Sequence, residues 1–536
     1  MKSYQWKFKT KKLRKSDNQY DRKLLDDDEP VEAIYIDSGT ESDALNPFIA
    51  ALPPAKEDDT QLMLKYTKGL SSYTFENVKN MTTHEKVMAV NEMRTKFRIC
   101  LSFQKQLEDS FHSSLVNSYR LRKLYRDTNA KIPANMDNKD IILHQKMYGD
   151  SANSANSSFA LLGYSGVGKS TSLNQLLMDY PQLIIHKIPG TEDRIPQIVY
   201  LVVNCLPNSN FNELYISIGK AIDRALGNIQ PYYEVAIRKT VGLSSKMNKV
   251  IELIETFNIG IILFDEIQLI DFKHTKENSF EGLMTIVNAT KVAIAVIGTE
   301  DAYSKMFINL RNARRVGTLI DASNYTENDS YFKNIVSFMM NYQWFDIWID
   351  CDDEIIDALK ECSYGIIDQL ISLYVMMHID YFEKKGKKPK VNGDYVRMIS
   401  RKYFPYMKQL NKLLRDPMAD KNLKQASEET QKHLNELLRK SEEQNKSSQE
   451  KQIELNDTML NIMKIKEQII QDIEDVGFER PEIENCFNKK IIDKGIENKT
   501  VKEIKKEIIT ELAKPKNQTT KKKKPSKDEM IQAIIQ

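Results

Sequence analysis

The sequence predicts an α/β fold built around a five-stranded parallel sheet. Short β-branched runs alternate with helical stretches from about residue 151 onward, an order typical of a parallel sheet. Between the first such run and the helix after it lies the glycine-rich segment Gly163-Tyr164-Ser165-Gly166-Val167-Gly168-Lys169-Ser170. This segment matches the phosphate-binding pattern G-x-x-x-x-G-K-[ST] at every fixed position. We therefore expect the sheet to form the core of a P-loop domain.

Five apolar runs supply the expected strands, and the helices between them are expected to begin near residues 169, 211, 245 and 279. The strands are expected at Phe159–Leu162, Ile198–Val203, Ile259–Phe264, Val292–Ile297 and Thr318–Ile320. Beyond about residue 335 the apolar spacing becomes helical, which predicts a helical lid and a helical C-terminal region. The expected divisions are an extended arm at 1–60, a helical N-terminal region at 61–150, a nucleotide-binding core at 151–335, a helical lid at 336–420, and a charged helical region with a small partner-docking module and a lysine-rich tail at 421–536.

The glycine-rich segment predicts a site for ATP with Mg²⁺. Glycines let the backbone turn its N–H groups inward around phosphates, at the start of a helix. Lys169 is expected to hold the β and γ phosphates, and Ser170 to place its hydroxyl on Mg²⁺, while Thr171 supplies a neighbouring hydroxyl that caps or packs. The alternative is a glycine-rich turn without a ligand, but the flanking strand and helix favour the nucleotide site. The expected nucleotide contacts are Gly163, Ser165, Gly166, Val167, Gly168, Lys169, Ser170 and Thr171.

A second apolar strand ends in two carboxylates, Asp265 and Glu266, about 95 residues after the loop. Opposite a phosphate loop, Asp265 is expected to orient Mg²⁺, directly or through water. Glu266 is expected to polarise the attacking water, because phosphoryl transfer depends mainly on positioning and charge stabilisation. The alternative is an ordinary acidic pair at a strand end.

Two further features follow the next strand. Thr299 comes directly after Val292–Ile297 and Gly298, where its hydroxyl would sense the γ-phosphate or the attacking water; the alternative is a turn-forming Gly-Thr. Arg314 and Arg315 precede the last strand, a position that faces a neighbouring subunit's nucleotide in oligomeric ATPases. Either arginine would serve as a finger in trans or would pair with an internal carboxylate.

The composition indicates a globular chain with basic ends. Its 536 residues are 41% hydrophobic and 29% charged, enough for two or three domains with a buried core. The net charge is only +3, yet residues 1–15 hold seven Lys or Arg and residues 514–527 hold seven Lys, with no acid in either segment. These ends are either arms for DNA phosphates and acidic partners or solvated tails.

Cysteine usage and hydropathy predict a cytoplasmic protein. The 5 cysteines are widely spread without a C-x-x-C motif, so they suggest neither a zinc site nor a disulfide framework. No run approaches the ~18 apolar residues of a membrane helix, and the N-terminus shows no signal peptide pattern. We expect no membrane partner.

A proline-bearing segment, Asn46-Pro47-Phe48-Ile49-Ala50-Ala51-Leu52-Pro53-Pro54, interrupts the N-terminal arm. Its apolar residues either dock a partner or pack on the body of the protein.

Several of these segments together resemble the TnsC family, the AAA+ ATPase regulators of heteromeric cut-and-paste transposons, and more distantly TniB and MuB. The resemblance covers roughly residues 40–415. Its most particular parts are the segment from Asn46 to Pro54 and the R-x-x-R-R stretch that ends at Arg315. The other parts are the phosphate loop, Asp265-Glu266-Ile267-Gln268 and Ile297-Gly298-Thr299.

The resemblance implies an AAA+ core that assembles on double-stranded DNA as a ring or helical filament. It also implies a bacterial-type cytoplasmic location. It implies TnsA-like and TnsB-like transposase subunits and a TnsD-like or TniQ-like target selector as partners. The residues that would meet the DNA backbone, unless they are merely solvated, are Asn208, Ser209, Asn210 and Lys220. Asp368 lies where many AAA+ lids carry a nucleotide-sensing arginine, a function that an aspartate cannot perform. The alternative is a replication-initiator-like or signalling AAA+ switch that acts on protein partners.

Overall fold

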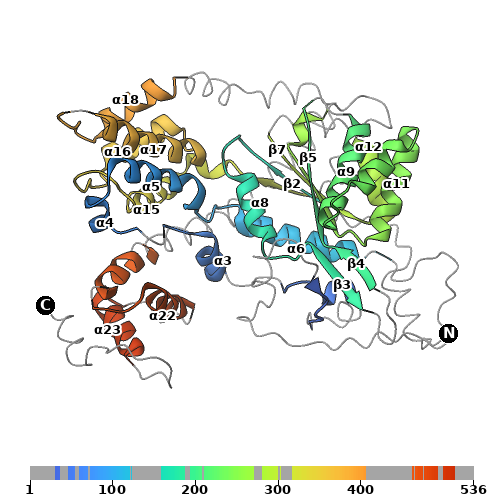
Figure 1. Cartoon of the computed structure of the whole chain (residues 1–536), viewed down its shortest axis with the longest axis horizontal. Helices are drawn as coiled ribbons and strands as arrows, with labels where there is room; N and C mark the ends of the chain where they lie inside the picture. Colours follow the sequence, from blue (N-terminus) through green and yellow to red (C-terminus); the bar gives the residue numbers. More distant parts are fainter. Residues whose placement is uncertain are drawn as a thin grey trace. The chain divides into compact units, whose positions relative to one another are not determined.

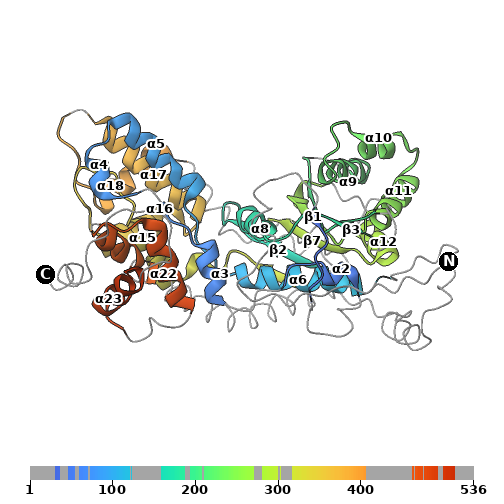
Figure 2. The same ribbon diagram turned by 60° about the horizontal axis from the view of Figure 1, so that its bottom comes forward.

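The computed structural model divides the chain into two compact units, which we call the sheet unit and the helical unit (Figures 1 and 2). The sheet unit contains the described residues up to 54 and from 103 to 323, and the helical unit contains those of 59–102, 324–405 and 462–513. The residues that the structure describes are 31–36, 46–54, 59–70, 73–120, 122, 158–187, 194–207, 210–270, 280–299, 302, 317–384, 386–405, 462–463, 465–474, 476–492 and 499–513.

The sheet unit is built on a five-stranded parallel sheet, which confirms the predicted fold class. The strand order is β5-β6-β7-β2-β8. Every neighbouring pair is parallel, so Phe159 of β2 lies opposite both Ala295 and Thr318. The strands are β2 (Phe159–Leu162), β5 (Tyr200–Asn204), β6 (Ile261–Asp265), β7 (Ala293–Gly298) and β8 (Thr318–Asp321). The observed strands thus lie within two residues of those predicted, as expected when apolar runs are bounded by polar residues.

A second, three-stranded sheet was not predicted. Its order is β1-β3-β4, from β1 (Val31–Glu32), β3 (Leu183–Lys187) and β4 (Arg194–Ile198). The predicted strand that begins at Ile198 merges the end of β4 with β5: Ile198 is the last residue of β4 and pairs with Leu183 in an antiparallel ladder. The apolar run from Ile198 to Val203 gives no sign of this change of sheet.

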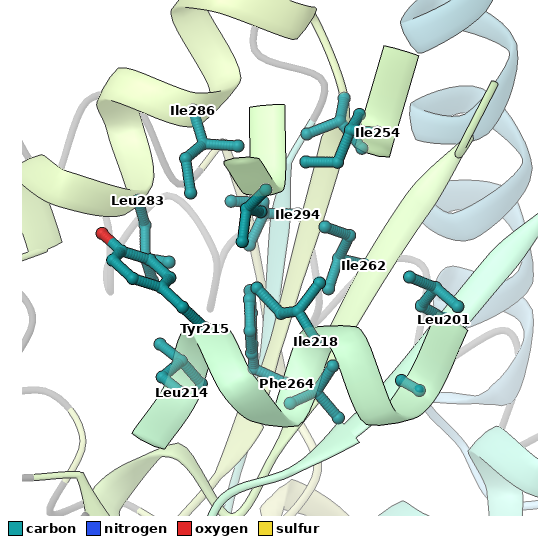
Figure 3. Close-up of a cluster of buried hydrophobic side chains, with 14 of the residues drawn as sticks. Leu201, Leu214, Tyr215, Ile218, Ile254, Ile262, Phe264, Leu283, Ile286 and Ile294 are labelled. Atoms are coloured by element: carbon teal, nitrogen blue, oxygen red, sulfur yellow. The ribbon is translucent and has the colours of Figure 1, made fainter. Parts of the chain in front are cut away.

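Amphipathic helices cover the parallel sheet because their apolar faces have the 3.6-residue period of a helix. The helix α9 (Phe211–Ala225) presents Leu214, Tyr215 and Ile218 to a cluster that includes Ile262 and Ile294 of the strands (Figure 3). It contacts α10 (Tyr232–Lys239) and α11 (Leu243–Thr256), and α11 in turn contacts α12 (Phe280–Thr290). The helices α6 (Gln104–Arg120) and α8 (Lys169–Leu177) contact each other, and α6 contacts β2, β6, β7 and β8. These packed layers hold the strand ends in place.

The proline-bearing segment packs on the sheet unit, so the packing alternative is the one observed. Asn46 is buried and caps α2 (Pro47–Ala50), with its side-chain oxygen accepting from the Phe48 N–H. Its amide nitrogen donates to the carbonyl of Tyr119 at 3.1 Å, and Phe48 stacks on that tyrosine ring. Gln197 of β4 donates to the Phe48 carbonyl at 2.9 Å.

The helical unit confirms the predicted helical regions after the core. Polar N-cap residues begin several of its helices: Thr82 and Thr500 form capping boxes with Glu85 and Glu503, and Asn392 caps α18. The helices are α3 (Asp59–Tyr66), α4 (Phe75–Lys79), α5 (Thr83–Lys96), α15 (Asp329–Met339), α16 (Asp353–Ser363), α17 (Ile367–Glu383), α18 (Gly393–Tyr403), α22 (Arg480–Ile492) and α23 (Val501–Leu512). Within the described part of the chain, no helix is both long and apolar enough to span a membrane.

Candidate nucleotide site

Polar residues gather at one edge of the parallel sheet. Because the strands are parallel and β6, β7, β2 and β8 are consecutive neighbours, their carboxyl ends meet at the same edge. The glycine-rich loop follows β2, Asp265 ends β6 and Thr299 follows β7. Three segments that were predicted separately from the sequence are thereby brought onto three adjacent strands.

The loop conformation depends on its glycines. Gly166 has φ +83° and Gly168 has φ +96°, a left-handed region that residues with a side chain rarely adopt. Gly163 is required by close approach instead, since a Cβ there would lie 2.6 Å from Oγ of Ser323. That hydroxyl accepts a 2.6 Å hydrogen bond from the N–H of Tyr164, so the segment after β8 holds the start of the loop.

Lys169 folds back over the loop. Its ammonium donates to the carbonyls of Gly163 at 2.9 Å and Tyr164 at 2.8 Å, and the side chain is buried. The residue is the first of α8, whose N-cap is Gly168. A positive charge therefore lies beside the N-terminus of a helix, where the backbone N–H groups and the helix dipole already favour an anion.

Ser170 and Asp265 are in direct contact. The serine hydroxyl donates to Oδ2 of Asp265 at 3.0 Å, and the N–H of Glu266 donates to Oδ1 at 2.9 Å. Burial raises the pKa of Asp265, and the charge of Glu266 adds to the rise, while these two hydrogen bonds and the charge of Lys169 oppose it. A partly buried carboxylate beside a hydroxyl is the pair of oxygen ligands that suits Mg²⁺.

Glu266 lies beside this pair with its backbone in the left-handed region, at φ +56° and ψ +40°. Its carboxylate accepts a hydrogen bond from the side-chain amide of Gln268. The same amide accepts, through Oε1, from the N–H of Thr299 at 3.1 Å. Among the described residues, Oγ1 of Thr299 is buried and has no hydrogen-bond partner.

The residues at this edge fit a nucleotide with a divalent cation. The positive-φ glycines give the loop a backbone turn that residues with a side chain rarely adopt, and Ser170 and Asp265 supply hard oxygen ligands. The Thr299 hydroxyl, which has no partner among the described residues, is a buried polar group that a phosphate oxygen or a water molecule would satisfy.

Comparison with known proteins agrees with this geometry. The family model described as an AAA domain matches residues 152–306. The chain carries an AAA-type P-loop ATPase domain. No curated protein sequence matches the chain.

Two solved structures are similar to the chain at low identity. A Walker-type ATPase of Pyrococcus abyssi is 15% identical over 48% of this chain and 71% of its own, with a TM-score of 0.29. The Orc1 protein of Aeropyrum pernix, solved in complex with DNA, is 12% identical over 66% of this chain and 76% of its own, also with a TM-score of 0.29.

The remaining predicted residues lie outside the described part of the chain, on helices α9 and α17, or in and beside the loop. Arg314 and Arg315, like Asn208 and Ser209, lie outside the described residues. Asn210 caps α9, with its side-chain oxygen accepting from the Glu213 N–H at 3.1 Å, and Lys220 is exposed on the same helix. Asp368 lies in the first turn of α17 in the helical unit. Within the loop, Val167 is fully buried, whereas Ser165 and Thr171 are exposed.

Sequence reasoning assigned no role to two residues at the strand edge, Gln268 and Ser323. Both follow the carboxyl ends of parallel strands, β6 and β8, so the rule that identified Asp265 and Thr299 would also have found them. Gln268 was noted only as the last residue of the segment Asp265-Glu266-Ile267-Gln268, and Ser323 belongs to no motif.

Proposed function

We propose that the ATPase domain hydrolyses Mg²⁺-bound ATP and that the whole chain regulates DNA transposition. It assembles on double-stranded target DNA in the ATP state, connects a target-selection protein of the TnsD or TniQ kind to a transposase of the TnsA and TnsB kind, and leaves DNA after hydrolysis. The contact between Ser170 and Asp265 beneath the glycine-rich loop supports the ATPase activity. The sequence segments shared with TnsC proteins support the role in transposition.

Each polar residue at the strand edge has a distinct task in this proposal. Lys169 and the loop N–H groups bind the phosphates, and Ser170 and Asp265 hold the cation. Mg²⁺, when bound, neutralises charge on the transferring phosphoryl group. Glu266 accepts a hydrogen bond from the attacking water and takes its proton. Thr299 orients that water or the γ-phosphate with its buried hydroxyl.

Assembly and DNA binding use other parts of the chain. We propose that Arg314 or Arg315 reaches the nucleotide of a neighbouring subunit. The basic ends, with Asn208, Ser209, Asn210 and Lys220, are proposed to contact DNA phosphates without reading sequence. If about six phosphates are neutralised per binding unit, log affinity falls against log salt with a slope of about −5.

Electron microscopy with duplex DNA and a non-hydrolysable ATP analogue tests the proposal. We expect rings or helical filaments with both ligands present, and none with Lys169→Ala, which removes the phosphate contact. Isolated particles under all conditions would contradict assembly on DNA and would favour the alternative, an initiator-like or signalling switch that acts on protein partners.

A further inference from the structure

Gln268 connects two parts of the strand edge that the proposed mechanism uses. Its side-chain amide donates to the carboxylate of Glu266 and accepts from the N–H of Thr299. A carboxylate can only accept and a backbone N–H can only donate, so a single orientation of the amide satisfies both partners. We call this arrangement of Glu266, Gln268 and Thr299 the amide bridge.

Two neighbouring residues, Gly298 and Ile267, allow the Gln268 amide to form the amide bridge. A Cβ at Gly298, the last residue of β7, would lie 2.5 Å from Oε1 of Gln268 and 3.0 Å from Cγ2 of Ile267. Glycine at this position therefore lets the amide rest against the end of the strand. On the other side, Ile267 begins the short helix η1 (Ile267–Leu269) and is fully buried, which anchors the turn that carries Gln268.

The amide bridge leaves Glu266 able to act on water. A carboxylate offers about four lone-pair sites, and the bridge uses one of them on Oε2. The bond restricts rotation of the carboxylate and links its orientation to the end of β7, beside the buried hydroxyl of Thr299. A displacement of Thr299 by a γ-phosphate would therefore be transmitted to Glu266 through the amide.

We propose that Gln268 is a positioning residue for ATP hydrolysis, which holds the Glu266 carboxylate in register with Thr299. The proposal rests on the proposed ATPase activity of the domain. Gln268 makes no contact with substrate in this proposal and transfers no proton; it acts only through Glu266.

Steady-state ATP hydrolysis by the full chain tests the proposal, because kcat and the KM for ATP are determined separately for each variant. Gln268→Met keeps the length of the side chain but removes the amide, so kcat should fall by ~10- to 100-fold with little change in KM for ATP. Gly298→Ala removes no polar group but displaces the Gln268 amide, so it should also lower kcat. The matched control is Gln182→Met in the same unit, where the amide donates only a 3.4 Å bond to the Tyr200 carbonyl in the described contacts; it should keep the wild-type rate.

A double variant separates a positioning effect from general disruption. If Gln268 acts through Glu266, then Gln268→Met should cause no further loss of turnover in a Glu266→Gln background. An equal further loss there would overturn the proposal.

Hydrogen exchange without nucleotide provides a readout that is independent of activity. The N–H of Thr299 should exchange faster in Gln268→Met than in the wild type, and at the wild-type rate in Gln182→Met. Unchanged protection of the Thr299 N–H in Gln268→Met, or a wild-type kcat in both Gln268→Met and Gly298→Ala, would overturn the positioning role of Gln268. Neither result would contradict the proposed ATPase activity. If the wild-type chain hydrolyses no ATP, the proposed function is wrong and the positioning role is wrong with it.

Discussion

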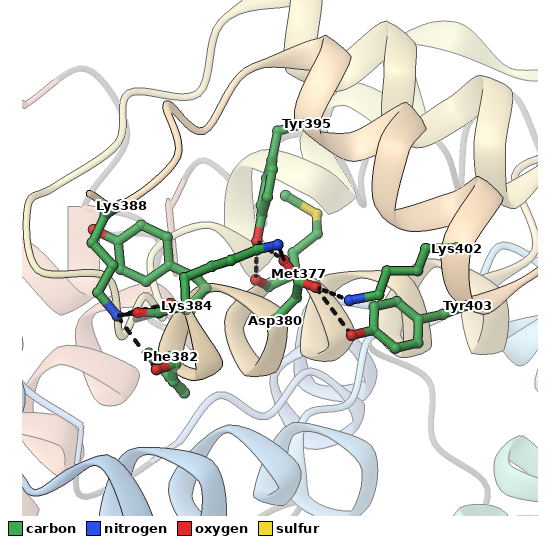
Figure 4. Close-up of polar contacts among 9 residues, drawn as sticks. Met377, Asp380, Phe382, Lys384, Lys388, Tyr395, Lys402 and Tyr403 are labelled. Atoms are coloured by element: carbon green, nitrogen blue, oxygen red, sulfur yellow. Dashed lines mark hydrogen bonds and ion pairs between the residues drawn. The ribbon is translucent and has the colours of Figure 1, made fainter. Parts of the chain in front are cut away.

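Two buried or partly buried aspartates, one in each unit, have opposite electrostatic surroundings. Asp265 of the sheet unit is bonded by a serine hydroxyl and a backbone N–H, and its pKa is raised. Asp380 of the helical unit accepts from Lys402 at 2.6 Å, Tyr403 at 3.0 Å and Tyr395 at 3.2 Å (Figure 4). Burial raises the pKa of Asp380, but hydrogen bonds from Lys402 and Tyr403, together with the lysine charges, outweigh it and bring the pKa below the usual value.

The difference in pKa and in hydrogen-bond donors indicates that the carboxylate of Asp380 is structural, whereas that of Asp265 is available for a ligand. Asp380 is almost fully buried on α17. Its hydrogen-bond donors Lys402, Tyr403 and Tyr395 all lie on α18, so these bonds stabilise the packing of the two helices. Asp265 is destabilised as an ion by burial, which a bound cation would offset. We therefore expect substitutions at the strand edge to change chemistry, and substitutions around Asp380 to change stability.

The largest expected effect is on turnover at the strand edge. Glu266→Gln should keep ATP bound but lower the hydrolysis rate by ~100-fold or more, because the amide preserves shape and cannot take a proton from water. Phosphate release and residence time on DNA are measured together, and the variant should stay on DNA longer than the wild type. The control is Glu252→Gln on α11, an exposed glutamate paired with Lys249. Wild-type hydrolysis by Glu266→Gln would show that this residue does not activate water.

The next effect sharpens the contrast between the two aspartates. Asp380→Asn should lower the free energy of unfolding by about 1.5–3 kcal/mol, because hydrogen bonds to a charged group are lost. Asp265→Asn, in the absence of Mg²⁺, should change the free energy of unfolding much less, since a disfavoured charge is removed, the amide oxygen still accepts from the Glu266 N–H, and the Ser170 hydroxyl can rotate to accept from the amide nitrogen. Scanning calorimetry of both variants measures the difference. Equal destabilisation by the two substitutions would contradict the distinction between a structural Asp380 and a ligand-binding Asp265.

Lys169→Ala should weaken ATP binding without unfolding the sheet unit. Loss of a charge-assisted contact costs about 1.5–3 kcal/mol, which is roughly 10- to 100-fold in Kd. Calorimetric titration with ATP measures this change. Lys187→Ala serves as the control, because Lys187 is an exposed lysine of the same unit that pairs with Glu32. An unchanged ATP affinity in Lys169→Ala would argue against a phosphate contact.

The last effect is a pH dependence of stability that arises from a buried histidine of the helical unit. His378 is fully buried and stacks on Phe345; burial lowers its pKa to about 3, although the hydrogen bond with the Tyr374 carbonyl opposes the shift. Below the unfolded-state pKa of about 6.5 the unfolded chain binds a proton that the folded chain does not. Stability should therefore fall, by at most about 1.4 kcal/mol per pH unit, as pH drops from 6.5 toward 3.

Replacement of this histidine isolates its contribution from that of other titrating groups. His378→Phe should reduce the loss of stability between pH 6.5 and 5, measured by denaturant unfolding at each pH. His84→Gln, an exposed position on α5, should leave the loss as in the wild type. Identical pH profiles for His378→Phe and the wild type would mean that the imidazole is not buried in its neutral form.

The sequence by itself determined the five strands of the parallel sheet and the phosphate-loop motif after the first of them. The strand Phe159–Leu162, the turn through Gly166 and Gly168, and the helix from Lys169 are adjacent in the chain, so local propensity and residue spacing suffice to predict them. The rule that parallel strands share a carboxyl edge then extends the prediction to Asp265 and Thr299.

Only the tertiary structure decided which partners these groups have. The bond from Ser170 to Asp265 spans 95 residues, and that from Thr299 to Gln268 spans 31. Likewise, the docking of Asn46 on Tyr119 and the change of sheet at Ile198 depend on distant segments. Such contacts form only when helices and strands pack against each other. The residues next to a side chain in the sequence do not predict them, because the same local sequence is compatible with many different tertiary partners.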